Sequence, residues 1–175
     1  MTHPSPTLPL RIADSIDRIS GVVGQTAAWL APFVVAAVFA LVVLRYVFGI
    51  GSVWLAESII YAHAAMFLLA AAWTLRDNGH VRVDIFYADA SPRRKALTDA
   101  LGALLLLLPF ALWLIWLSWP YAARSWAILE RSHETSGLPA VFILKSLIPL
   151  FAALLALQGV SQLIRAIHTL RDGAR

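Results

Sequence analysis

The sequence predicts an all-α integral membrane protein with four transmembrane helices. The chain of 175 residues is 60% hydrophobic and only 14% charged, whereas soluble domains have about 45–50% apolar and about 25% charged residues. Its mean hydropathy is +0.75. Four long stretches carry no charge, and each can cross a hydrocarbon core about 30 Å thick as a helix. A soluble enzyme of ordinary composition is therefore excluded.

The uncharged stretches define the expected elements in order. They run through 19–44, 58–75, 100–123 and 146–164. With flanking residues they predict spans at about 21–45, 54–76, 96–123 and 142–165, joined by short connections in a single transmembrane domain over residues 1–175. Ser52 and Ser91 stand where helix N-caps are expected. Residues 1–10 contain three prolines and are expected to be disordered.

Basic residues outside these spans predict the orientation. Ten Lys and Arg residues lie in the N-terminal segment, the second connection and the C-terminal tail, against four in the first and third connections. Cytoplasmic loops carry the excess of Lys and Arg, so both termini are expected in the cytoplasm. Trp54 belongs to a group of aromatic residues at the proposed outer interface, which is typical of membrane proteins. A nucleic-acid partner is not expected, because the basic residues are scattered between apolar blocks.

Few residues in the spans could carry chemistry. His63 and Gln158 are the most deeply placed polar side chains, and a haem held by two histidines would need a second histidine inside the membrane. A packing or interfacial role for His63 is therefore favoured over a haem ligand. The chain has no cysteine and no HExxH, P-loop or GxSxG motif. We expect no enzymatic activity and no catalytic residue, cofactor or metal site.

The first external connection predicts an ion pair. Gly49 and Gly51 indicate a tight hairpin, with Arg45 about one helical turn before it and Glu57 a little more than one turn after Ser52. Opposite charges at similar depth would relieve each other's desolvation. The alternative is that both side chains reach the interface independently. We favour the pair.

The connection between the second and third spans mixes apolar and charged residues over 79–87. An interfacial or docking segment fits this pattern, with His80, Arg82 and Asp84 as its polar residues. The alternative is a basic loop that only sets topology, but such a loop would not need so many apolar residues.

Several motifs together resemble the small membrane subunit of tripartite ATP-independent periplasmic (TRAP) transporters. They are Arg45-Tyr46-Val47-Phe48-Gly49, Trp54-Leu55-Ala56-Glu57 and Gly79-His80-Val81-Arg82-Val83-Asp84. Ser136-Gly137-Leu138-Pro139 and Lys145 are similar to one branch of that family. The resemblance implies a bacterial inner-membrane location and structural or interface roles for Arg45, Trp54, Glu57, His80, Arg82, Asp84 and Lys145.

The resemblance also implies partners. In that family a large permease subunit binds substrate and sodium, a periplasmic solute-binding protein delivers an organic acid or similar solute, and the small subunit braces the large one in the bilayer. Two alternatives are a self-contained oligomeric exporter and the membrane anchor of a redox complex. An exporter should show a carboxylate well inside a helix, and a redox anchor should show paired histidines.

Overall fold

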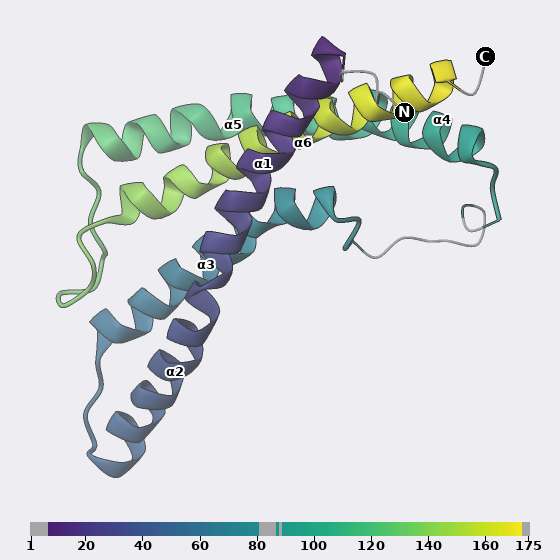
Figure 1. The fold of residues 1–175 in the computed structure, drawn as a ribbon. Helices are drawn as coiled ribbons and strands as arrows, with labels where there is room; N and C mark the ends of the chain where they lie inside the picture. Colours follow the sequence, from purple (N-terminus) through teal and green to yellow (C-terminus); the bar gives the residue numbers. More distant parts are fainter. Residues whose placement is uncertain (1–6, 81–86, 88, 173–175) are drawn as a thin grey trace.

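The computed structural model describes residues 7–80, 87 and 89–172, and these contain helices and no strand. The elements are α1 (Leu8–Ala28), α2 (Leu30–Val47), α3 (Val53–Arg76), α4 (Pro92–Gly102), a π-helical turn η2 (Ala103–Leu107), α5 (Leu108–Ala127) and α6 (Val141–Asp172) (Figure 1). Four helical rods, Leu8–Val47, Val53–Arg76, Pro92–Ala127 and Val141–Asp172, are long and apolar enough to cross a membrane. The predicted fold class is confirmed.

The first rod differs from its expected span at both its start and its middle. Helix α1 begins at Leu8 with Pro9 in its first turn. Proline is favourable there, because a backbone N–H in the first turn has no acceptor within the helix. Residues 8–10, expected to be disordered, are therefore helical. The rod is then interrupted at Trp29, between α1 and α2. Pro32 follows closely and has no N–H to donate to the carbonyl of Ala28, which explains the break.

The third rod contains a similar adjustment. Pro109 cannot donate to the carbonyl of Leu105, and the π-helical turn Ala103–Leu107 ends two residues before this proline. Turns of this kind accommodate a lost bond without ending a helix. The predicted N-caps are confirmed: the hydroxyl of Ser52 accepts from the amide of Leu55 at 3.2 Å, and that of Ser91 accepts from the amide of Arg94 at 3.4 Å.

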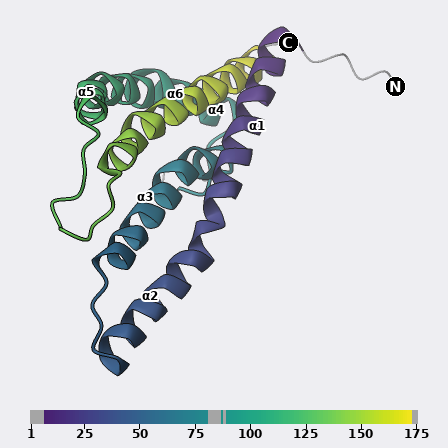
Figure 2. The same ribbon diagram turned by 90° about the vertical axis from the view of Figure 1, so that its left-hand side faces the viewer.

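Helices α1, α3 and α6 form the centre of the molecule, since each contacts the other two. Helix α5 runs antiparallel to α6, whereas the α2–α3 hairpin extends away from the α5–α6 pair (Figures 1 and 2). Close approach of α1 and α3 depends on Gly24, where an added Cβ would lie 2.9 Å from the Cγ of Trp73. Small residues serve this purpose in membrane helices.

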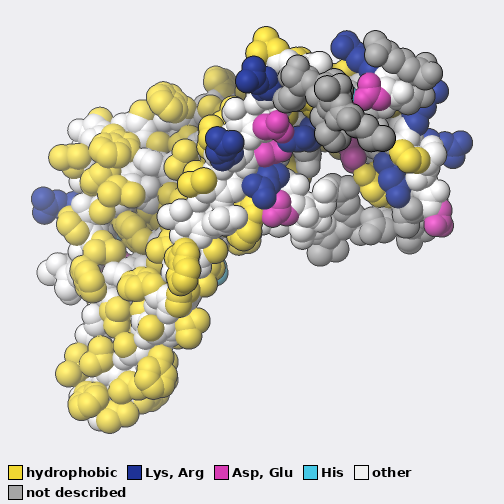
Figure 3. Space-filling view, viewed as in Figure 1, with side chains coloured by type: hydrophobic (Ala, Val, Ile, Leu, Met, Phe, Trp, Pro, Cys, Tyr) yellow, Lys and Arg dark blue, Asp and Glu magenta, His cyan; other side chains and the backbone are white. Residues whose placement is uncertain are grey.

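The surface is divided into an apolar and a charged part. Figure 3 shows hydrophobic side chains over the α2–α3 hairpin and the α5–α6 pair, and charged side chains gathered around the start of α1 and the end of α6. Helix α2 buries only Ala37 within the described chain, and Phe39 is 70% exposed. Apolar surface of this extent indicates that lipid or another protein covers the hairpin.

Candidate functional site

Polar residues of the chain collect in two clusters at opposite ends of the helices. The α1–α6 cluster consists of Asp14, Asp17, Arg76, Gln158, Ser161 and Arg165. The loop cluster consists of Glu57 on α3, Lys145 on α6, and Glu130, Ser132 and Leu138 in the α5–α6 connection. Both join elements that are far apart in the sequence.

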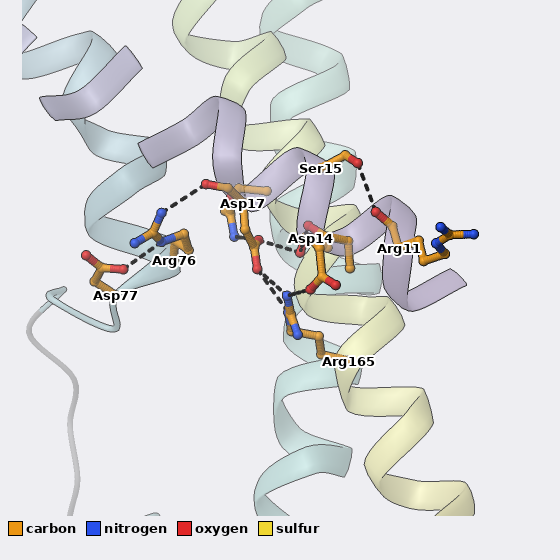
Figure 4. A network of polar contacts seen from close by, with 10 residues as sticks. Arg11, Asp14, Ser15, Asp17, Arg76, Asp77 and Arg165 are labelled. Atoms are coloured by element: carbon orange, nitrogen blue, oxygen red, sulfur yellow. Dashed lines mark hydrogen bonds and ion pairs between the residues drawn. The ribbon is translucent and has the colours of Figure 1, made fainter. Parts of the chain in front are cut away.

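Asp17 lies at the centre of the α1–α6 cluster (Figure 4). Its Oδ2 accepts from Nε of Arg165 at 3.0 Å and from Nη2 at 2.5 Å. Its Oδ1 accepts from Nε2 of Gln158 at 2.9 Å and from the hydroxyl of Ser161 at 2.6 Å. Arg165 also donates to Asp14 at 2.7 Å. One carboxylate therefore gathers four donor atoms from α6.

The third helix of the centre joins the same cluster. The Nη1 of Arg76, at the end of α3, donates to the backbone carbonyl of Asp17 at 3.0 Å. The Nε of Arg76 donates to Asp77 at 2.7 Å. Gln162 of α6 donates to the carbonyl of Leu75 at 3.2 Å, which satisfies one of the carbonyls left unpaired at a helix end. The cluster thus fixes the register of α1, α3 and α6 against one another.

Burial distinguishes the members of this cluster. Ser161 is 0% and Gln158 2% exposed, whereas the side chain of Asp17 is 18% and that of Arg165 is 45% exposed. The charged groups lie toward the surface and the neutral donors lie deeper. This order keeps the desolvation cost of the ion pair low, and it suits a structural role.

Glu57 organises the loop cluster. Its Oε1 accepts from the hydroxyl of Ser132, and its Oε2 accepts from the backbone amide of Leu138. Gly137 lies between these partners, and a Cβ there would lie 2.5 Å from Cβ of Ser132 and 2.7 Å from Oε1 of Glu57. The α5–α6 connection therefore closes tightly over one carboxylate of α3.

A second contact of the loop cluster joins the two ends of the connection. The Nζ of Lys145 donates to Glu130 at 2.6 and 2.8 Å and lies 4.2 Å from the ring centroid of Tyr121. The amide of Val141 donates to the carbonyl of Glu130 at 3.1 Å. The ammonium of Lys145 holds the pKa of the Glu130 carboxyl below its ordinary value, because it stabilises the charged form.

The predicted ion pair between Arg45 and Glu57 is wrong. Both oxygens of Glu57 are occupied by Ser132 and Leu138, while Arg45 is exposed in the last turn of α2. Similar depth on adjacent helices does not place two side chains on facing sides, and Glu57 faces the α5–α6 connection. A cation in the last turn of a helix is favourable by itself, so Arg45 needs no partner carboxylate.

The other predicted residues lie in separate places. Trp54 is exposed in the first turn of α3, and His80 is exposed shortly after its last turn. Lys145 belongs to the loop cluster. Arg82 and Asp84, with most of the expected interfacial segment 79–87, lie outside the described residues.

His63 lies near the middle of α3 and is exposed on this chain. Ile60, 57% exposed, and Phe67, 68% exposed, lie one helical turn on either side of it. An ionisable residue at this depth normally faces protein or water rather than lipid. Within the described part of the chain, no group of three histidine or carboxylate side chains is placed to hold a metal ion.

Sequence reasoning missed the centre of the α1–α6 cluster. Asp17 was not predicted as a site residue, and Arg165 entered only the count of basic residues outside the spans, although the two are bonded across 148 positions. A local signal was present: Asp14 and Asp17 are spaced to lie on one face of a helix. Gln158 was noted, but its partner was not.

The comparisons with known proteins agree with this architecture. The family model described as "Tripartite ATP-independent periplasmic transporters, DctQ component" matches residues 34–169. No curated protein and no solved structure matches the chain. The matched residues include α3, α4 and α5, most of α2 and nearly all of α6. The chain therefore belongs to the DctQ family, the small permease component of TRAP transporters.

Proposed function

We propose that this chain is the non-transporting brace of a sodium-coupled importer, in which a large permease subunit carries the solute across the membrane. A periplasmic solute-binding protein would deliver an organic acid or similar solute to that subunit. Family membership supports this division of labour and favours it over a self-contained exporter or a redox anchor.

The use of polar groups inside the chain carries the proposal. A transported polar solute needs groups that replace its hydration near the membrane centre. Here the buried donors Gln158 and Ser161 bond to Asp17, and Glu57 bonds to the α5–α6 connection. These polar groups form hydrogen bonds between elements of this chain, as expected of a structural subunit.

The exposed face of α3 is the proposed contact with the large subunit. His63 would be costly against lipid tails, and a hydrogen-bonding group of a neighbouring helix would relieve that cost. Ile60 and Phe67 would supply apolar contact on either side of it. His63→Leu is expected to weaken co-purification of the large subunit. His168→Leu, at the far end of α6, serves as the matched control.

The orientation is proposed with both termini in the cytoplasm, as the basic residues predict. The described residues form four rods that could span the membrane, and this even number supports termini on one side. Reporter fusions after Gly51 and Ser136 should read periplasmic, and fusions after Ser91 and Arg175 cytoplasmic. A periplasmic reading after Ser91 would contradict the orientation.

Reconstitution tests the function directly. The purified chain in liposomes should show no sodium-driven uptake, and uptake should appear only when the large subunit and the binding protein are both added. Uptake of solute by this chain alone would overturn the proposal. The same liposomes with the large subunit and binding protein but without this chain measure how much the brace contributes.

A further inference from the structure

Helix α1 has an apolar outer face in addition to the inner face that packs against α3 and α6. Residues of the outer face are spaced alternately by four and three positions, which is the spacing of the seam of a coiled coil. We call this set the α1 stripe: Leu8, Ile12, Ser15, Ile19 and Val22. Its four apolar members are 47% to 71% exposed, so the stripe is open to a partner helix.

The α1 stripe crosses the boundary of the membrane. Arg76 ends α3 and donates to the carbonyl of Asp17, so Asp17 lies at the level where that span ends. Leu8 lies about 14 Å beyond Asp17 along the helix, at about 1.5 Å per residue, whereas a headgroup layer is about 5–8 Å thick. Ile19 and Val22 lie on the other side of Asp17, beside the hydrocarbon core. Acyl chains could therefore cover only one half of the stripe, and a soluble protein only the other.

Two arginines follow one edge of the α1 stripe and indicate the charge of its partner. Arg11 and Arg18 are exposed, and neither forms an ion pair with a carboxylate among the residues that the structure describes. Figure 4 shows the guanidinium of Arg11 pointing away from the α1–α6 cluster. Carboxylates on a partner would therefore be complementary to this edge.

A second copy of this chain fits the α1 stripe poorly. In an antiparallel pair of α1 helices, Arg11 and Arg18 would face arginines of the other copy. In a parallel pair they would face Ile16 and Val23. The first arrangement places like charges together and the second leaves the arginines without a partner, so a different protein is favoured.

We propose that the α1 stripe binds one helix of the large permease subunit, which crosses the membrane and continues beyond it with carboxylates opposite Arg11 and Arg18. A single helix of this kind would cover both halves of the stripe. The inference rests on the proposed function, which makes the large subunit the membrane partner of this chain. Helices α1 and α3 lie side by side, so one large subunit can contact both.

Photocrosslinking in the assembled complex tests this assignment. Photoreactive p-benzoylphenylalanine replaces Ile12, outside the hydrocarbon core, or Val22, inside it, in the full chain expressed with the large subunit. Both positions should crosslink to the large subunit, and mass spectrometry of the peptides should place both crosslinks on one helix. Thr98, exposed on a helix that does not contact α1, is the control position and should give little of this product. Crosslinks from Ile12 only to lipid, to a soluble protein or to a second copy would overturn the proposal.

Charge variants test the recognition of carboxylates. Arg11→Glu/Arg18→Glu should lower the recovery of the large subunit about tenfold, because two attractions become repulsions. Arg11→Lys/Arg18→Lys should keep the recovery, and Arg171→Glu, also exposed, is the matched control. A reporter fusion after Ser91 checks that each variant keeps its orientation. Full recovery in the double Glu variant would overturn the assignment of carboxylates to the partner.

An uncharged variant tests the apolar contact without changing any basic residue. Ile12→Gln should lower the recovery of the large subunit about tenfold, because the burial of one isoleucine is lost. Leu97→Gln, at an apolar position of α4 that is also about half exposed, should leave it unchanged. Unfolding in SDS reports whether either variant weakens the chain itself. Natural recovery with Ile12→Gln would overturn the contact.

The outcomes separate this inference from the proposed function. If the complex assembles and transports solute while Ile12 is crosslinked only to lipid, the inference fails and the proposed function stands. If the natural chain recovers no large subunit, both fail, and reconstitution in liposomes shows the second failure independently.

Discussion

The two polar clusters both supply hydrogen-bond donors to a partly buried carboxylate, but the donors differ. In the α1–α6 cluster, the carboxylate of Asp17 is bonded by side chains, among them the charged Arg165. In the loop cluster, the carboxylate of Glu57 is bonded by a neutral hydroxyl and a backbone amide. The carboxylate of Asp17 depends on several side chains of α6, whereas that of Glu57 depends on the path of the connecting segment.

This difference indicates what each cluster can do. Side chains from three spans must meet in one register to build the α1–α6 cluster, so it specifies how the rods cross. The loop cluster is built around one tight connection and specifies where the α5–α6 turn lies against α3. We infer that damage to the first should loosen the whole chain, and damage to the second should loosen one end.

Removal of the Asp17 carboxylate should have the largest effect. Asp17→Ala leaves Gln158, Ser161 and Arg165 without their shared acceptor. Each buried group that loses its hydrogen-bond partner costs about 1–3 kcal/mol. We expect the free energy of unfolding to fall by about 2–3 kcal/mol, because part of the cluster is exposed to water. Unfolding by SDS in mixed micelles, followed by circular dichroism, measures it.

Asp14→Ala is the matched control for that change. Asp14 contacts the same arginine, but its side chain is 55% exposed. Exposed ion pairs contribute about 0–1 kcal/mol, so this variant should be nearly as stable as the natural chain. Equal losses in the two variants would mean that charge alone, and not the buried acceptor, holds the helices.

Glu57→Ala should act locally. Ser132 and the amide of Leu138 would lose their acceptor, and the α5–α6 connection would open more often, since exposed loops are the first parts of a protein to unfold. Trypsin should then cleave after Arg131 several-fold faster, while unfolding in SDS changes little. Glu134→Ala, in the same connection, is the control. Cleavage at the natural rate in Glu57→Ala would show that the loop is held by other contacts.

The sequence could predict those parts of the fold that depend on nearby residues. Long uncharged runs gave four spans, and Ser52 and Ser91 capped the helices expected of them, because caps act within one turn. The clusters could not be found in this way. Glu57 and Ser132 are 75 positions apart, and Asp17 and Arg165 are 148 apart, so their contact depends on how complete helices pack.

The motif residues also show that spacing along the sequence does not predict which side chains contact each other. Arg45 and Glu57 belong to motifs that identify the family, yet the pairing inferred from their spacing was wrong. Spacing along a hairpin fixes depth but not the direction in which each side chain points. The motif therefore predicted the family correctly, while only packing revealed that Glu57 holds the α5–α6 connection.

The smallest expected effect is a dependence of the loop cluster on pH. Lys145 holds the pKa of Glu130 below its ordinary value near 4.5. The contribution of this pair to stability is therefore fully present above about pH 4.5 and is lost as the pH falls through the lowered pKa of the folded chain. Hydrogen exchange of the amides at 128–140, corrected for the intrinsic rate at each pH, should be constant from pH 7 to 5 and rise below that range. Glu130→Gln should exchange faster at neutral pH and lose the dependence. A rise of the same size in Glu130→Gln would assign the titration to another carboxylate, with Glu57 the first to test.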